Sequence, residues 1–249
     1  MNSKVFNLLL KNLKKQLNLP KYDSIRDSIN SCTSLDDIML TPAKRHKFES
    51  SIKEELEFDD IDFTGSLEEI TNRLDSRYTG RFFSQIWKPN TDSHKFTGWN
   101  IVDQVNQLSP RRVLDYGCGY NQFKEHIPGL IGIDPYNESA DYMVDIFEFV
   151  DDVESFDVIL ILGSLNFNSY EDIESRFAKI VSFLKPGGKV FFRANPGIQW
   201  PNGPYVDIFA WSFKFASELG KKYNMHIETY KKDPGANGER LYFVYEKLS

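Results

Sequence analysis

The chain has 249 residues, 41% of them hydrophobic, and a formal net charge of −6, which allows a sizeable core but argues against a broad basic surface for nucleic acid. Its two cysteines lie in unrelated segments and its four histidines are scattered, so neither a disulfide framework nor a metal site is predicted. No apolar run approaches the roughly 18 residues of a transmembrane segment and nothing resembles a secretory signal, so we expect a cytoplasmic protein.

Residues 1–70 are predicted to form a helical extension. Apolar residues recur with helical spacing over Val5–Leu17, with lysines between them, which predicts an amphipathic helix. Thr41, followed by a proline, suits the start of a second helix, and Ser66 with Glu69 forms a capping box that opens another. The first helix could pack on the rest of the protein, bind a protein partner or lie on a membrane surface, and the sequence leaves all three open.

Charge is unevenly distributed along this extension. Residues 1–50 hold nine lysines and arginines against five acids, whereas residues 51–70 hold one lysine against eight acids. Solvated helix faces explain this pattern, and so does docking of the basic region on an acidic partner. A protein partner that binds through the N-terminal helices is therefore one interpretation of the extension.

Residues 71–94 are predicted to form a connector rich in aromatic and basic side chains, including Phe82, Phe83 and Trp87. These rings could cap the edge of a sheet as core residues, or they could cover a bound ligand. Residues 97–108 carry an apolar stripe with helical spacing, which predicts a packing helix that precedes the first strand.

The most informative segment is Arg112–Tyr120. It predicts a buried strand and a glycine turn, followed by a short helix and a second strand that ends at Asp134. Gly117 and Gly119 can bring bare backbone against a ligand, and the carboxylate of Asp134 suits a ribose because it can accept hydrogen bonds from both hydroxyl groups. A dinucleotide-binding domain is the competing interpretation, but its third glycine would fall at Gln122.

The later segments follow in the order of an open α/β sheet. Strands and a terminal antiparallel hairpin are predicted over residues 140–146, 156–162, 190–193, 225–230 and 240–245. A helix is expected over 170–184, and a Lys-Pro-Gly-Gly turn at 185–188 stops it. These features alternate strand and helix as a mostly parallel sheet requires.

Together the motifs resemble the class I S-adenosylmethionine-dependent methyltransferases over residues 95–249. The family pattern Asp-x-Gly-x-Gly is matched by Asp115, Gly117 and Gly119, whereas the further glycine that often follows is replaced by Asn121. Asparagine tolerates a positive φ, so the turn can survive this change. The resemblance implies an α/β fold, with a doubly wound, mostly parallel seven-stranded sheet and an antiparallel C-terminal hairpin, here preceded by the helical extension.

The resemblance also implies S-adenosyl-L-methionine as the cofactor. It places the ribose at the acid after the second strand and the adenine edge at the acid after the third. The predicted cofactor-binding residues are Asp115, Tyr116, Gly117, Cys118, Gly119, Asp134, Pro135, Asp145, Ile146, Gly163 and Ser164.

Methyl transfer requires mainly that the nucleophile is aligned and water excluded, so acceptor-side residues are sought where the fourth and fifth strands end. Asn166, Arg193 and Asn195 lie there and are the candidate catalytic residues. Arg193 could equally form a structural ion pair, and Asn195 also suits a turn. Residues 198–205 are expected to form a rim loop over the acceptor site.

The sequence argues against two classes of methyl acceptor but does not identify the acceptor. The Pro-Pro-aromatic motif of DNA amino-methyltransferases is absent, and no cysteine follows Cys118 to serve as a cytosine C5 nucleophile. A small molecule, a protein or an RNA site remains as the acceptor. The alternative is a non-catalytic scaffold, which Asn121 permits but which has no need of Asp115, Asp134 and Asp145 together.

Overall fold

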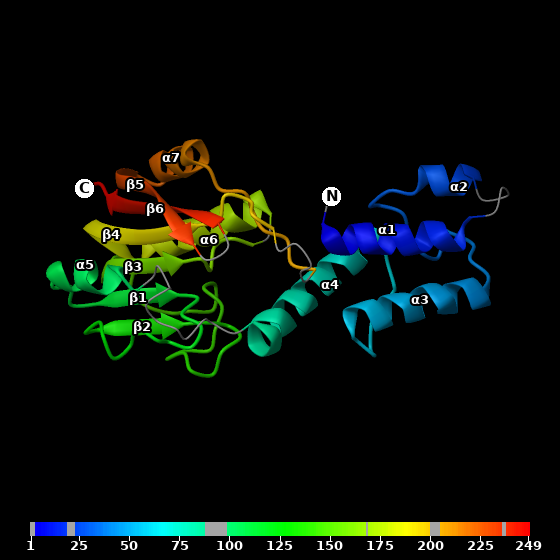
Figure 1. Ribbon diagram of the computed structural model, residues 1–249, viewed down its shortest axis with the longest axis horizontal. Helices are drawn as coiled ribbons and strands as arrows, with labels where there is room; N and C mark the ends of the chain where they lie inside the picture. Colours follow the sequence, from blue (N-terminus) through cyan, green and yellow to red (C-terminus); the bar gives the residue numbers. More distant parts are fainter. Residues whose placement is uncertain (1–2, 19–22, 88–98, 168, 200–204, 236–237) are drawn as a thin grey trace. The chain divides into compact units, whose positions relative to one another are not determined.

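The computed structural model describes residues 3–18, 23–87, 99–167, 169–199, 205–235 and 238–249 (Figure 1). Contacts divide the chain into two compact units. The first unit comprises residues 1–82 and the short segment 202–207, and the second comprises residues 83–201 and 208–249. The sequence-based division at residue 70 lies inside a helix of the first unit.

Four helices build the first unit. They are α1 (Lys4–Gln16), α2 (Asp23–Ser28), α3 (Pro42–Leu56) and α4 (Leu67–Arg81). Ser3 caps α1 by accepting the Phe6 N–H at 2.9 Å. The predicted caps of the later helices are confirmed, because Thr41 caps α3 and Ser66 forms a complete capping box with Glu69 at the start of α4.

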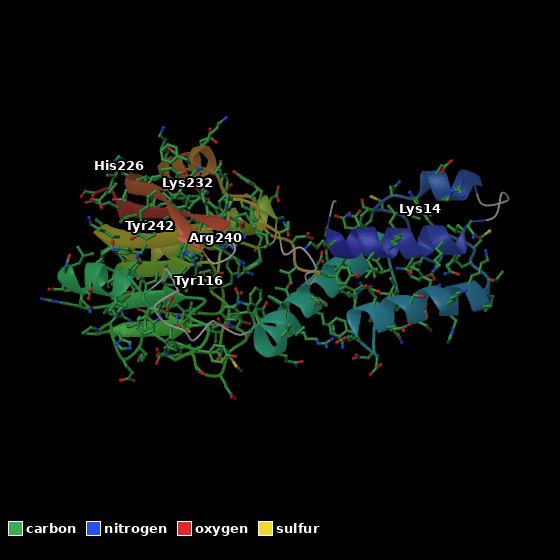
Figure 2. All side chains as sticks on the ribbon, in the orientation of Figure 1. Lys14, Tyr116, His226, Lys232, Arg240 and Tyr242 are labelled. Atoms are coloured by element: carbon green, nitrogen blue, oxygen red, sulfur yellow. The ribbon has the colours of Figure 1, made fainter. Side chains whose placement is uncertain are left out.

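The apolar face of α1 is buried inside its own unit. Val5, Leu9 and Leu13 are fully buried, and α1 packs against α3 and α4. The apolar stripe that a membrane-surface helix would need is therefore used for packing among the helices. The lysines of α1 lie on the opposite face, where Lys14 is exposed (Figure 2).

The segment that ends at Asp207 completes the first unit. The backbone N–H of Lys4 donates to Asp207 Oδ2 at 2.9 Å, and Lys4 Nζ donates to the Val206 carbonyl at 3.3 Å. The ring of Tyr205 meets that of Tyr78 edge to face, with centroids 5.8 Å apart. Helices near the N-terminus and a segment far along the chain thus share one core.

The second unit is built on a six-stranded sheet in the order β2-β1-β3-β4-β6-β5 (Figure 1). The strands are β1 (Val113–Tyr116), β2 (Leu130–Ile133), β3 (Phe156–Leu162), β4 (Leu184–Ala194), β5 (Met225–Gly235) and β6 (Gly238–Lys247). Strands β1 to β4 are parallel, and β6 lies antiparallel between β4 and β5. The mostly parallel α/β sheet and its antiparallel terminal hairpin are confirmed.

Helices cover both faces of this sheet. They are α5 (Ile101–Gln107), α6 (Tyr170–Ser182) and α7 (Phe213–Lys222). The π-helix η2 (Phe82–Ile86) lies earlier in the chain, where the first unit ends and the second begins. Side chains of β3 alternate between two cores: Ile159 and Ile161 pack with α6 and α7, whereas Val158 and Leu160 pack with α5. This alternation is that of a strand buried on both faces.

The predicted strand over residues 140–146 does not form, so the described part of the sheet has six strands and not seven. Tyr142 makes only an isolated parallel bridge to Ile133. The Asp141 carboxylate accepts the Gly132 N–H at 2.8 Å, and Lys124 pairs with the same carboxylate. A side chain thus takes the donor that a neighbouring strand would use, and the ladder cannot extend.

Parts of two predicted elements lie outside the residues that the structure describes. Residues 200–204 of the predicted rim loop, and the first two residues of the helix predicted over 97–108, lie outside the described residues. Within the described ranges, no helix combines the length and apolarity needed to cross a membrane. The same ranges contain no group of three side chains suited to a metal ion.

Candidate cofactor site

The glycine loop after β1 depends on close packing that only glycine permits. Gly117 and Gly119 have φ values of +69° and +54°, which side-chain-bearing residues rarely adopt. A Cβ on Gly117 would lie 2.2 Å from the Cβ of Ser164, which follows β3. The N–H groups of Gly117 and Cys118 both donate to the Ile133 carbonyl, at 2.8 and 3.1 Å. The loop is therefore fixed against both neighbouring strands.

Asn121 replaces the further glycine of the family pattern and adds a tie of its own. Its φ is +54°, so the prediction that asparagine would preserve the turn is confirmed. Its Nδ2 donates to the Ser139 carbonyl at 3.1 Å. A Cβ on Gly132 would lie 2.5 Å from Asn121 Oδ1. The absence of a side chain at this position of β2 therefore leaves space for the Asn121 side chain.

The short helix expected after the glycine loop is absent. Residues 120–127 form turns, with three-residue bonds from Asn121 N–H to the Cys118 carbonyl and from Lys124 N–H to the Asn121 carbonyl. The left-handed φ of Asn121 interrupts a helix at this place. A dinucleotide domain would seat pyrophosphate on a helix N-terminus here, and this segment offers none.

Asp115 is a deeply buried acid of the second unit. Its side chain is 3% exposed, and its Oδ2 has no hydrogen-bond partner among the described residues. Burial, and then the nearby charge of Asp134, raise the pKa of Asp115 to about 7. A buried carboxylate oxygen without a donor suits a cationic or hydrogen-bond-donating ligand group.

Asp134, which follows β2, holds the glycine loop by a hydrogen bond. Its carboxylate accepts the Gly119 N–H at 3.0 Å and the Tyr136 N–H at 2.8 Å. Burial raises the pKa of Asp134, although these backbone bonds oppose the shift. A carboxylate can accept about four hydrogen bonds, so Asp134 keeps capacity for a ligand while it orients the glycine loop.

A pocket opens over the glycine loop, with an empty volume of about 480 Å³ that includes its mouth. It brings together four of the predicted cofactor residues, Asp115, Gly117, Cys118 and Gly119. Its other walls come from Trp87, Tyr120, Gln122, Phe123 and Leu162. Sequence reasoning singled out Trp87 only as a connector aromatic and Tyr120 only as part of the glycine segment, and it did not assign the other three.

Tyr116 points away from this pocket. Its side chain belongs to the core beneath α6 and α7, and its hydroxyl accepts from Arg176 at 3.4 Å. Burial raises its pKa to about 12. The backbone of Tyr116, and not its side chain, therefore borders the glycine loop. Its carbonyl accepts a hydrogen bond from the Ser164 hydroxyl.

The predicted adenine-edge residues are engaged elsewhere. Asp145 pairs with Arg176 at 2.6 Å and accepts the Phe147 N–H at 3.1 Å, while Arg176 also pairs with Asp172. Ile146 is fully buried in the sheet core. Neither side chain belongs to the pocket wall. Four further predicted cofactor residues also lie outside the wall, namely Asp134, Pro135, Gly163 and Ser164.

Two of the three candidate catalytic residues are tied to backbone groups. Asn166 Nδ2 donates to the Gly163 carbonyl at 2.9 Å, and its Oδ1 accepts the Asn195 N–H at 2.9 Å. The Oδ1 of Asn195 accepts the N–H groups of Gly197 and Ile198, at 2.9 and 2.7 Å. Both amides are buried and tie the ends of β3 and β4 together.

Arg193 is half-buried near the end of β4. Its register partners are Leu162 of β3, which lines the pocket, and Tyr242 of β6. Along β4 it alternates with Phe192 and Ala194, which pack beneath α6 and α7, so it lies on the sheet face that carries α5. Arg193 is thus placed beside the pocket wall but outside the residues that form it.

The architecture was compared with known proteins. No model of a protein family matches the chain, and a search of curated proteins finds no match. Among solved structures, 1,6-didemethyltoxoflavin-N1-methyltransferase of Burkholderia thailandensis is 17% identical, with a TM-score of 0.54 over 73% of this chain and 90% of that one. Magnesium protoporphyrin IX methyltransferase of Synechocystis PCC 6803 is 10% identical, with a TM-score of 0.54 over 70% of this chain and 97% of that one.

The chain has the class I S-adenosylmethionine-dependent methyltransferase fold. In this methyltransferase fold, ligands bind where the parallel strands end, and the pocket over Gly117 and Gly119 lies at that edge. Both solved structures are covered almost completely, whereas more than a quarter of this chain has no counterpart in either. The methyltransferase fold is therefore accompanied by additional chain.

Proposed function

We propose that this protein binds S-adenosylmethionine in the glycine-loop pocket and transfers its methyl group to a small molecule. The observation that carries the proposal is the buried Oδ2 of Asp115, which lacks a hydrogen-bond donor among the described residues, in a residue that lines the pocket. The cofactor carries an ammonium group that could supply this donor, and its ribose hydroxyls suit the remaining capacity of Asp134. The residues present therefore fit the cofactor.

Bound S-adenosylmethionine supplies an electrophilic methyl group on its sulfonium. The chain's own part is to orient the cofactor, align the acceptor and keep water out. The glycine loop and Asp134 provide a fixed backbone surface for orientation. Because Asn166 and Asn195 are engaged with backbone groups, we infer that they hold the ends of β3 and β4 in place and do not act on the acceptor.

Small molecules are favoured over the other acceptors. The two solved methyltransferases described above are named for small-molecule substrates, and the net charge of −6 gives little general attraction for RNA. The cytoplasm is the proposed location. The adenine-edge role of Asp145 and Ile146, and an acceptor contact by Arg193, remain predictions.

Calorimetric titration of the full chain with S-adenosylmethionine and S-adenosylhomocysteine tests the proposal. We expect both to bind with one-to-one stoichiometry, and NADH, the matched dinucleotide control, not to bind. Substitution of Asp152, an exposed acid, by alanine should leave the affinity unchanged, whereas Asp115→Ala should weaken it. A folded wild-type protein that binds neither adenosyl compound would instead support the non-catalytic scaffold.

The helical unit has a separate proposed role as a docking surface for a protein partner. Its apolar side chains are used in its own core, while Lys11, Lys14 and Lys15 are exposed on α1. These features build a charged surface and contribute nothing to the glycine-loop pocket. Replacement of the three lysines by glutamate should therefore leave S-adenosylhomocysteine affinity unchanged, and a large loss would contradict this separation of roles.

A further inference from the structure

Aromatic side chains from four segments meet beside the cofactor pocket. Phe83 lies in η2 and Trp87 directly follows it, Tyr120 belongs to the glycine loop, Tyr136 follows β2, and Phe167 follows β3. We call these five residues the aromatic rim. Because β2 and β3 are parallel, their following segments reach the same edge of the sheet, where open α/β sheets bind ligands.

The rim is continuous, with Phe83 at its centre. The Phe83 ring meets Phe167 edge to face at a centroid distance of 4.8 Å, and it lies nearly parallel to Tyr136 at 6.2 Å. Trp87 is 6.1 Å from Phe83 on one side and 6.5 Å from Tyr120 on the other. Trp87 and Tyr120 also line the pocket, so the rim is a direct extension of the proposed cofactor site.

These rings differ from the aromatic residues of the sheet core. Phe192, Trp211 and Phe243 contact one another and are at most 2% exposed, as expected for rings that stabilise the fold by burial. Tyr120 and Tyr136 are 44% and 38% exposed. Large rings left open beside a pocket mark a surface that a ligand covers.

Among the described residues, the surroundings of the rim provide ring faces and few polar groups without a partner. The amides of Asn166 and Asn195 are engaged with backbone, and Arg176 pairs with acids on its own helix and after Tyr142. No lysine or arginine occurs between residues 125 and 175, the stretch that contains Tyr136 and Phe167. Ring faces are therefore the main recognition chemistry that this part of the structure offers.

We propose that the aromatic rim binds the methyl acceptor, and that the acceptor is a planar aromatic or heteroaromatic small molecule. This inference rests on the proposed methyltransferase function and names its substrate class. Stacking selects flat molecules because a planar ring presents its whole face to another ring. The unusual π-helical turn that carries Phe83 is a type of distortion found often at functional sites, and here it brings Phe83 and Trp87 to the same edge.

Binding of flat and saturated rings to the full chain tests this inference. The protein is saturated with S-adenosylhomocysteine and titrated with indole, quinoline and 2-naphthol, with decahydro-2-naphthol as the non-planar counterpart of the last. Ligand-observed NMR detects weak binding of each. We expect 2-naphthol to bind at least about fivefold more tightly than its saturated counterpart.

Two variants and one control assign the binding to the rim. Phe83→Leu and Phe167→Leu keep an apolar side chain but remove the ring, and each should weaken 2-naphthol binding at least about fivefold while S-adenosylhomocysteine affinity changes less than twofold. Phe213→Leu is the control, because Phe213 is 48% exposed and contacts only Tyr230 among the described aromatic rings. It should change neither affinity.

Three results would overturn the inference. Flat and saturated compounds could bind equally, none of the flat compounds could bind, or the two rim variants could lose S-adenosylhomocysteine affinity in parallel, which would make the rim a cofactor cover. Failure of wild-type protein to bind S-adenosylhomocysteine would instead defeat the proposed function, and with it the acceptor assignment, however the flat rings behave. The two failures are therefore distinguishable.

Discussion

The two halves of the sheet's carboxyl edge carry polar residues in equivalent places but use them differently. At the ends of β1 and β2, Asp115 keeps a buried oxygen that no described donor satisfies, and Asp134 orients the glycine loop with acceptor capacity to spare. At the ends of β3 and β4, the amides of Asn166 and Asn195 are engaged with backbone groups. A strand-end position therefore selects polar residues, but the bonds that each already makes separate binding groups from scaffold groups.

The largest expected effect comes from breaking the contact that joins these halves. In Gly117→Ala the new Cβ would lie 2.2 Å from Ser164 Cβ, so we expect the free energy of unfolding to fall by about 3 kcal/mol or more. Gly187→Ala is the matched control, because its φ of +73° is similar but nothing lies within 4 Å of a Cβ there. It should cost only about 1 kcal/mol. Urea denaturation measures both, and equal losses would show that the contact is unimportant.

The next prediction concerns the scaffold half. Asn195→Ala leaves the N–H groups of Gly197 and Ile198 without their acceptor, so it should lower the free energy of unfolding by about 2–3 kcal/mol. S-adenosylhomocysteine affinity should not change. Asn106→Ala is the control, since among the described residues this exposed amide bonds only the His126 carbonyl, and the variant should cost under about 1 kcal/mol. Full stability with lost methyl transfer would return Asn195 to a catalytic role.

At the ends of β1 and β2, a substitution is expected to change the affinity for the cofactor. Asp134→Ala removes a charged acceptor proposed for the ribose, and the Gly119 and Tyr136 N–H groups lose their partner. We expect S-adenosylhomocysteine to bind about 10- to 100-fold more weakly, which corresponds to the loss of about one charge-assisted bond. Calorimetry on protein shown to be folded by circular dichroism measures this. Wild-type affinity in the folded variant would remove Asp134 from the site.

The smallest effect is a pH dependence at Asp115. Its folded pKa is raised to about 7, so its contribution to stability is fully present below the ordinary value of 3.8 and is lost as pH rises through 7. The proposed ammonium contact requires the ionised form, so S-adenosylhomocysteine affinity should rise, by less than about tenfold, between pH 6 and pH 8. Asp115→Asn should abolish this rise. A rise of the same size in the variant would assign the titration to another group.

Structural features that depend on residues close together in the sequence were predictable. The caps at Thr41 and Ser66, the buried strand Phe156–Leu162 and the positive φ of Asn121 follow from local chemistry. The strand over residues 140–146 was wrongly predicted, because propensity does not reveal that the Asp141 side chain takes the Gly132 donor.

The candidate site was predictable only in part for a similar reason. Asp115, Gly117 and Gly119 lie in one short motif, and the structure brings them to one pocket. The bonds of Asn166 depend on residues 29 positions away. The aromatic rim depends on four segments whose meeting is fixed by strand order and not by any local pattern.

The hydrogen bond from Lys4 to Asp207 has a consequence for folding during synthesis. These residues are 203 positions apart, and at about 5–20 residues per second a ribosome needs roughly 10–40 s to make the intervening chain. Helices α1 to α4 therefore emerge well before the segment that completes their unit. Strands β1 to β4 of the second unit also precede that segment. The N-terminal unit is begun first, but it can be finished only after the parallel strands have left the ribosome.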